Sequence, residues 1–102
     1  LLSPTTVAMY HVNQAPLEAL AIGYDIFERG YGYSLGTRVL MDPAKDGIVG
    51  SVGEFGWGGA FGTYFWVDPV AELYGILMTQ CPDPLNPKQT LLKQMVYQAL
   101  VR

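Results

Sequence analysis

The stretch Glu54-Phe-Gly-Trp-Gly-Gly-Ala-Phe-Gly-Thr-Tyr-Phe-Trp-Val-Asp-Pro69 combines aromatic and β-branched residues with closely spaced glycines. Its composition is typical of a strand, so we predict one long strand over Glu54–Val67, closed by a turn at Asp68-Pro69. Three glycines within four residues weaken that strand by about 0.5–1 kcal/mol each. An edge without side chains lets another backbone or a ligand approach, and its N–H groups could donate to an oxyanion. Packing of a helix on the glycine patch explains the pattern equally well.

Two further strands are predicted on either side of this one in the sequence. Tyr33–Asp42 is rich in strand-forming residues, and Leu73–Thr79 is almost entirely apolar, as in a strand buried on both faces. Residues 43–53 hold a proline and three glycines, which favours a loop. The connection that follows Val67 is short, so the second and third strands should pair antiparallel.

The N-terminal residues carry a helix start signal. Ser3 can cap a helix whose first position is Pro4, and we expect this helix to end near Asn13. The segment that follows is ambiguous, because residues 16–22 could form one or two helical turns that Gly23 would stop.

A second helix start signal lies near the C-terminus. Asn86 is expected to cap a helix with Pro87 at its first position and Gln89 at the spacing of a capping box. The fold prediction is therefore α+β, with an antiparallel sheet of about three strands flanked by N- and C-terminal helices in one domain, residues 1–102. The residues predicted to pack on the sheet recur at helical spacing: Leu92, Met95, Val96, Ala99 and Leu100.

Composition restricts the class of protein. Half of the residues are apolar and 15% are charged, which excludes intrinsic disorder. Because so few charges cover the surface, we expect another chain, most simply an identical copy, to bury part of it. A net charge of -3 with scattered basic residues argues against nucleic-acid binding, and no apolar run approaches a membrane span. One histidine and one cysteine, Cys81, exclude an internal disulfide and the usual metal sites, and no basic neighbour activates that cysteine.

One pentapeptide matches a catalytic pattern. Gly32-Tyr-Ser-Leu-Gly36 is a Gly-x-Ser-x-Gly, which presents a nucleophilic serine in α/β-hydrolases. The residues after it continue as a strand and the one histidine precedes it, so a serine at a strand twist or bulge is the alternative interpretation. If the chain is catalytic, Ser34 is the first candidate nucleophile and His11 the default base. The other candidates are Ser51 and Ser3 as nucleophile, and Lys45 or a carboxylate as base.

Several segments, in this order, resemble the C-terminal part of the serine β-lactamase-like superfamily, and within it the family VIII carboxylesterases and the relatives of class C β-lactamases. The helix start and the tyrosine- and glycine-rich strand have counterparts there, and Trp-Gly-Gly stands where the family has Lys-Thr-Gly or His-Gly-Gly. The matching segments are Leu2-Ser-Pro-Thr-Thr-Val7, Gly30-Tyr-Gly-Tyr-Ser-Leu-Gly-Thr-Arg-Val39, Gly56-Trp-Gly-Gly-Ala60, and Tyr64-Phe-Trp-Val-Asp-Pro69 with the apolar strand to Gln80.

This resemblance implies one wall of a hydrolase site. Trp57, Gly58 and Gly59 would line a substrate cleft, and the Ala60 N–H would be one oxyanion donor. The family's second donor is the N–H of the nucleophilic serine, which belongs to a Ser-x-x-Lys motif. That motif and the family's Tyr-x-Asn lie upstream in full-length members, and this sequence contains neither.

Three functions remain open from the sequence. The first is a truncated serine hydrolase of the carboxylesterase type, which acts on short-chain esters with weak β-lactam turnover as a side activity. The second is a non-catalytic remnant that forms homo-oligomers, and the third is one half of a split hydrolase. The expected ligand is a small ester, with no cofactor, metal, nucleic acid or membrane involved. No leader pattern is visible, so we expect a location in the bacterial cytoplasm.

Overall fold

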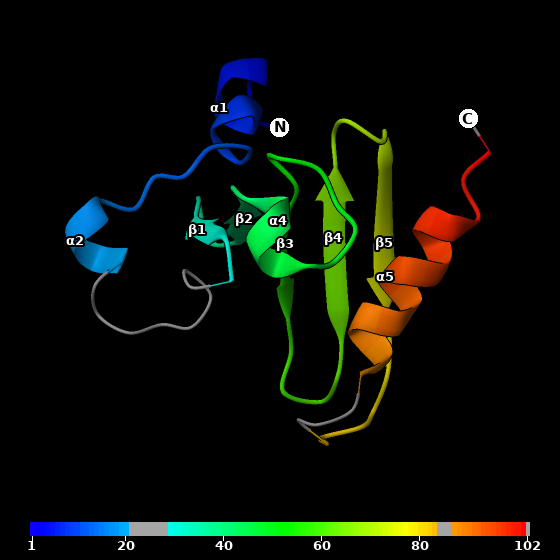
Figure 1. Ribbon diagram of the computed structural model, residues 1–102. Helices are drawn as coiled ribbons and strands as arrows, with labels where there is room; N and C mark the ends of the chain where they lie inside the picture. The colour runs from blue at the N-terminus through cyan, green and yellow to red at the C-terminus, as the bar shows by residue number, and fades with distance from the viewer. Residues whose placement is uncertain (21–28, 84–86, 102) are drawn as a thin grey trace.

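The computed structural model describes residues 1–20, 29–83 and 87–101. Within these ranges five strands form one antiparallel sheet in which the order of the strands follows their order in the chain (Figure 1). The α+β prediction is confirmed, but the strands number five rather than about three. They are β1 (Tyr31–Tyr33), β2 (Arg38–Leu40), β3 (Phe55–Gly58), β4 (Tyr64–Asp68) and β5 (Leu73–Leu77).

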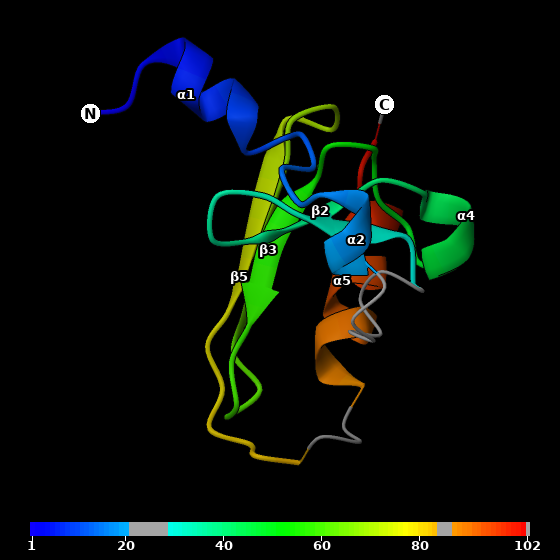
Figure 2. The same ribbon diagram turned by 90° about the vertical axis from the view of Figure 1, so that its left-hand side faces the viewer.

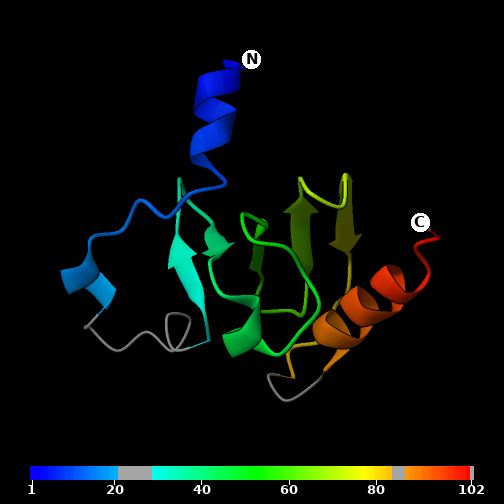
Figure 3. The same ribbon diagram turned by 45° about the horizontal axis from the view of Figure 1, so that its top comes forward.

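Helices lie on either side of the sheet. The longest, α5, covers one face over β4 and β5, whereas α1 lies at the other end of the molecule (Figure 2, Figure 3). Side chains that follow α1 contact the opposite face, because Tyr10 and His11 pack against the ring of Phe55. None of the helices in the described residues is long and apolar enough to cross a membrane. Their bounds are α1 (Pro4–Met9), α2 (Leu17–Leu20), α4 (Pro43–Asp46) and α5 (Lys88–Gln98).

Two of the three predicted strands are wrong in extent, because each region contains a tight turn. Predicted strand Tyr33–Asp42 holds the turn between β1 and β2, closed by the Ser34 N–H, which donates to the Thr37 carbonyl oxygen at 2.7 Å. Predicted strand Glu54–Val67 splits into β3 and β4. In each turn a glycine has the left-handed backbone that other residues avoid, with φ +87° at Gly36 and +81° at Gly62.

The N-terminal helix begins as predicted and ends early. The Thr6 N–H donates to the Ser3 hydroxyl at 3.1 Å, which confirms the cap, but α1 ends at Met9 and not near Asn13. The Asn13 side chain accepts from the Tyr33 N–H of β1 at 3.0 Å, which holds this segment against the sheet instead of in a helix. Of the ambiguous segment, Leu17–Leu20 is helical, and the predicted stop at Gly23 lies outside the described residues.

The sheet-facing side of α5 differs from the prediction. Lys93 is buried there, and the Tyr97 hydroxyl reaches the sheet, while the predicted core residue Met95 is 58% exposed. Pro87 occupies the cap position without a side-chain bond, and the predicted cap, Asn86, lies outside the described residues. The predicted loop over residues 43–53 also contains a short helix, α4. Polar contacts therefore replace part of the expected apolar packing between α5 and the sheet.

The buried core lies between α5 and the sheet. Trp66 of β4 is fully buried, as is Leu40 of β2. A Cβ at position 75 would overlap the Trp66 ring, so Gly75 of β5 leaves the space that the indole occupies. The other face of the sheet is largely open, and its aromatic and aliphatic side chains are exposed.

Candidate functional site

The end of β3 is an open strand edge. β3 pairs with β4 along its whole length, but in the described residues β2 pairs only with Phe55 and Gly56. Trp57 and Gly58 therefore have a neighbouring strand on one side only. The turn continues through Gly59, whose N–H donates to the Thr63 carbonyl oxygen at 2.8 Å.

Ala60, next in this turn, offers a free donor. The residue is exposed, and its N–H donates to no acceptor within residues 1–20, 29–83 and 87–101. A free backbone N–H at a rigid turn can donate to a carbonyl oxygen that develops negative charge. The four residues predicted to form one site, Trp57 to Ala60, are all exposed, and two of them are glycines without a side chain.

An apolar groove of about 300 Å³ lies beside this segment. Its floor is a row of side chains across three strands, since Trp57 pairs with Phe65 and Phe65 with Ile76. The Trp57 side chain is 43% exposed, and the Tyr33 ring meets it edge-on with centroids 5.9 Å apart. Such a groove can hold an aliphatic chain or another apolar surface. The rest of its lining consists of Gly58, Gly59, Thr63, Tyr64, Leu77 and Met78.

Ser34 lies in the turn between β1 and β2 and is only 5% exposed. Its hydroxyl donates to the Met9 carbonyl oxygen at 2.9 Å, which joins this turn to α1. A nucleophilic role would require the hydroxyl to leave that bond. The prediction that Ser34 attacks a substrate stays a prediction.

His11 follows α1 and contacts the start of β3. Its Nδ1 lies 3.2 Å from the Gly53 carbonyl oxygen, and its ring packs on Phe55 with centroids 5.1 Å apart. In the described residues no hydrogen bond joins His11 to Ser34, so the structure does not pair the predicted base with the predicted nucleophile. Of the other candidates, the Ser51 hydroxyl donates to Asp68, Ser3 caps α1 and Lys45 is exposed on α4.

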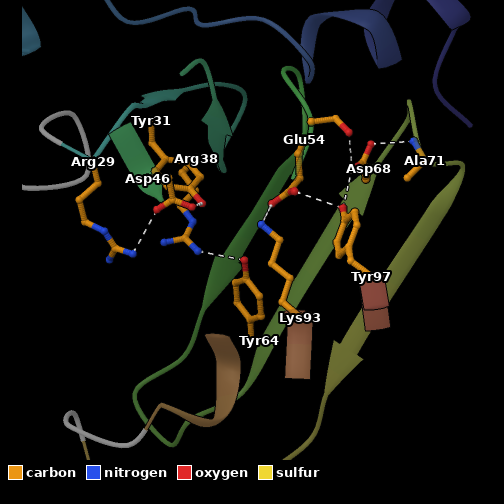
Figure 4. Close-up of polar contacts among 11 residues, drawn as sticks. Arg29, Tyr31, Arg38, Asp46, Glu54, Tyr64, Asp68, Ala71, Lys93 and Tyr97 are labelled. Carbon is orange, nitrogen blue, oxygen red and sulfur yellow. Dashed lines mark hydrogen bonds and ion pairs between the residues drawn. The ribbon is translucent and has the colours of Figure 1, made fainter. Parts of the chain in front are cut away.

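Our sequence analysis did not predict the buried polar network under α5, which we call the α5 cluster: Ser51, Glu54, Asp68, Lys93 and Tyr97 (Figure 4). The Lys93 ammonium donates to the Glu54 carboxylate at 2.6 Å, and the side chains are 3% and 2% exposed. The Tyr97 hydroxyl donates to Asp68 and lies 3.4 Å from Glu54, so it links the two carboxylates.

Burial and hydrogen bonding shift the two carboxylates in opposite directions. Burial raises the pKa of Glu54, and the neighbouring Lys93 ammonium offsets only part of that effect. Burial also acts to raise the pKa of Asp68, but hydrogen bonds from Tyr97, Ser51 and two backbone N–H groups hold it below its usual value. Burial and the bond to Asp68 raise the pKa of Tyr97, so its hydroxyl stays a donor at neutral pH.

A second polar group, the arginine cluster, lies beside the α5 cluster on the side of β1 and β2: Arg29, Tyr31, Arg38, Asp46 and Tyr64 (Figure 4). The buried Asp46 carboxylate accepts from Arg29 at 3.2 Å and from the Tyr31 hydroxyl at 2.8 Å. Arg38 donates to the Tyr64 hydroxyl at 3.0 Å and lies over the Tyr31 ring, 4.5 Å from its centroid.

A signal for these clusters is present in the sequence. Gln89, Lys93 and Tyr97 recur every four residues and so lie on one face of α5. Two residues of this stripe, Lys93 and Tyr97, contact the Glu54 and Asp68 carboxylates. Within the described ranges no group of three or more His, Cys, Asp or Glu side chains could hold a metal ion.

The comparisons with known proteins give partial matches. The chain is similar to two proteins of Mycobacterium tuberculosis, the uncharacterized protein MT1414 of strain CDC 1551 / Oshkosh and the protein Rv1367c of strain H37Rv. Each is 41% identical over 58 residues, which cover 53% of this chain and 14% of the relative. The matched region is thus a small part of much longer proteins, and their names state no activity. No protein-family model matches the chain.

Proposed function

We propose that this chain forms one wall of the substrate cleft in a serine hydrolase that cleaves short-chain carboxylic esters, with β-lactam turnover as a weak side activity. The observation that carries the proposal is the exposed Ala60 N–H, which has no acceptor within the described residues and follows directly after Gly59, a lining residue of the apolar groove at Trp57. The resemblance of the surrounding segments to the C-terminal part of the serine β-lactamase-like superfamily supports the same function.

Each part of this wall has a role in ester cleavage. The Ala60 N–H would donate to the carbonyl oxygen as it becomes an oxyanion, an interaction that strengthens in the transition state. The groove beside Trp57 would hold the apolar acyl or alcohol part of the ester. The open edge at Gly58 leaves room for the backbone that carries the nucleophile.

The nucleophile has two possible sources. In the first, Ser34 leaves its bond to Met9 and attacks within this chain. In the second, a serine of a Ser-x-x-Lys motif comes from sequence outside these residues, on the same or another chain. The relatives are long enough to carry such a segment, because the match covers 14% of their length.

The first experiment measures hydrolysis of p-nitrophenyl acetate and butyrate by the purified chain. We expect Trp57→Ala to lower kcat/KM for butyrate about tenfold and for acetate less, because the longer acyl chain makes more use of the groove. Tyr74→Ala is the matched control, since this aromatic residue is exposed on β5 outside the groove lining. Equal effects of the two substitutions would contradict the proposed cleft.

Two variants then locate the nucleophile. Activity that is lost in Ser34→Ala places it in this chain, and activity that persists in His11→Ala removes the imidazole as base. If the chain alone is inactive, activity should appear on mixing with a partner that carries Ser-x-x-Lys. Absence of activity in both settings would refute the proposed function.

A second candidate function is assembly without catalysis. The open face of the sheet exposes Tyr74, Ile76 and Met78, and in the described residues β5 has a paired strand on one side only. Unpaired strand edges with apolar side chains associate with other strands. A homo-oligomer formed through β5 would account for these features without any chemistry at Ala60.

A further inference from the structure

A small polar cavity lies on the helix-covered side of the sheet, away from the groove at Trp57. Its volume is about 60 Å³, which suits an ion of a few heavy atoms. Residues from β1, β2, β4 and the first turn of α5 surround it. Three of its lining side chains are cations, Arg29, Arg38 and Lys93, and the others include Tyr31, Tyr64 and Thr90.

Two of these cations already have carboxylate partners. Arg29 pairs with Asp46 at 3.2 Å, and Lys93 pairs with Glu54 at 2.6 Å. Arg38 differs, because in the described part of the chain no carboxylate lies within ion-pair distance of it.

Among the residues that the structure describes, the Arg38 guanidinium makes one side-chain hydrogen bond, to the Tyr64 hydroxyl, although it carries five N–H donors. The guanidinium carbon also lies over two aromatic rings, 4.5 Å from the Tyr31 centroid and 5.4 Å from the Tyr64 centroid. The face of a ring stabilises the charge but does not act as a counter-ion for the guanidinium N–H groups. The edge of the guanidinium therefore has donors to offer to the cavity, as Figure 4 shows for its position between Asp46 and Tyr64.

A largely buried cation without a counter-ion is costly, and an anion in the cavity would remove that cost. The planar fork of arginine matches the two oxygens of a carboxylate or phosphate. The Thr90 hydroxyl lies in the first turn of α5, where the helix dipole also favours negative charge. The three cations of the lining and the two carboxylates that pair with them, Asp46 and Glu54, together carry one net positive charge. That charge suits a small anion of low charge.

We propose that this cavity binds a small oxyanion, a phosphate or a carboxylate, through the free donors of Arg38. The ligand lies on the far side of the sheet from the proposed ester cleft, so its binding does not depend on hydrolysis. Bound anion would connect β2 to the start of α5 and stabilise the packing of that helix on the sheet.

Thermal unfolding of the full chain tests the proposal, with potassium phosphate or potassium acetate compared against potassium chloride at equal ionic strength. At a phosphate concentration ten times its dissociation constant, mass action should raise Tm by about 5–10 °C. Arg38→Gln should abolish the rise. Lys45→Gln is the matched control, because it removes the same charge from an exposed site on α4 and should keep the rise.

Thr90→Val supplies a second test if Arg38→Gln does not fold, and it should reduce the rise by half or more. A rise with phosphate alone identifies a phosphate group as the ligand, and a rise with both salts admits carboxylates. The proposal is overturned if neither salt exceeds chloride, or if Arg38→Gln and Thr90→Val both respond as Lys45→Gln does.

Discussion

Replacing Lys93 with methionine should remove the buried ion pair that joins α5 to Glu54 and so weaken the packing of α5 on the sheet. The substitution keeps the length of the side chain but leaves the Glu54 carboxylate buried without its ammonium partner, which now lies at 2.6 Å. Loss of one member of a buried ion pair costs about 3–5 kcal/mol. Since the free energy of unfolding of a whole domain is only about 5–15 kcal/mol, the variant should be close to the limit of folding.

Urea denaturation at pH 7, followed by far-ultraviolet circular dichroism, gives the free energy of unfolding. Lys45→Met is the control, because the same substitution at an exposed position should change it by less than about 0.5 kcal/mol. The double variant Lys93→Met with Glu54→Gln should recover about half of the loss, because it removes the unpaired charge. A loss below about 1 kcal/mol in Lys93→Met, or simple additivity in the double variant, would refute a coupled buried pair.

The pH dependence gives an independent check on the same pair. Without the ammonium, the pKa of Glu54 in the folded state should rise further above its unfolded value, because the hydrogen bond from Tyr97 alone then lowers it against the effect of burial. A carboxyl whose pKa is raised on folding is destabilising when ionised, so that penalty shrinks as the pH falls below the folded pKa. Lys93→Met should therefore lose less stability at pH 5 than at pH 8.

Three other predictions follow from the fold. Gly75→Ala should lower the free energy of unfolding by about 1–3 kcal/mol, because the new methyl group overlaps the Trp66 ring. Gly36→Ala should lower it by about 1 kcal/mol, because space is open there and only backbone strain arises. Urea denaturation compares the two variants. Because the pKa of Asp68 is lowered on folding, its stabilising effect is present above about pH 4 and is lost as the pH falls through the folded pKa. Asp68→Asn should therefore reduce the dependence of the urea midpoint on pH in the acidic range. Light scattering at micromolar concentration should show an oligomer that Ile76→Lys converts to a monomer, and a wild-type chain that is already monomeric would exclude assembly through β5.

The sequence was sufficient for the fold class and for the positions of strand-forming segments. Local signals account for these predictions, such as the Ser3 cap and the apolar run at Leu73–Leu77. That run was wrongly predicted to be buried on both faces, because Tyr74 and Ile76 are exposed on one of them. It was not sufficient to count the strands, because a glycine within a strand-like run is compatible with both a bulge and a hairpin turn. Gly36 and Gly62 form turns, and the pairing across each turn involves residues that local patterns do not connect.

Of the candidate site, too, one part could be predicted from the sequence and another part could not. Trp57 to Ala60 could be predicted as a unit because neighbours in the sequence stay neighbours in a strand and its turn. The contacts of Ser34 and His11 could not, since each depends on where the end of α1 and the residues after it meet the sheet. The buried pair of Glu54 and Lys93 also escaped prediction, because it joins residues 39 positions apart.

The agreement between strand order in the sheet and order along the chain has a kinetic consequence. Three of the four pairs of neighbouring strands are joined by short turns, at residues 34–37, 59–63 and 69–72, and such local contacts form quickly, with single hairpins closing in about 1–10 μs. Docking of α5 brings together distant residues and so belongs to a later stage of folding. Interactions made after the rate-limiting step slow unfolding rather than speed folding, so the lifetime of the native chain should depend on Lys93 far more than its rate of formation does.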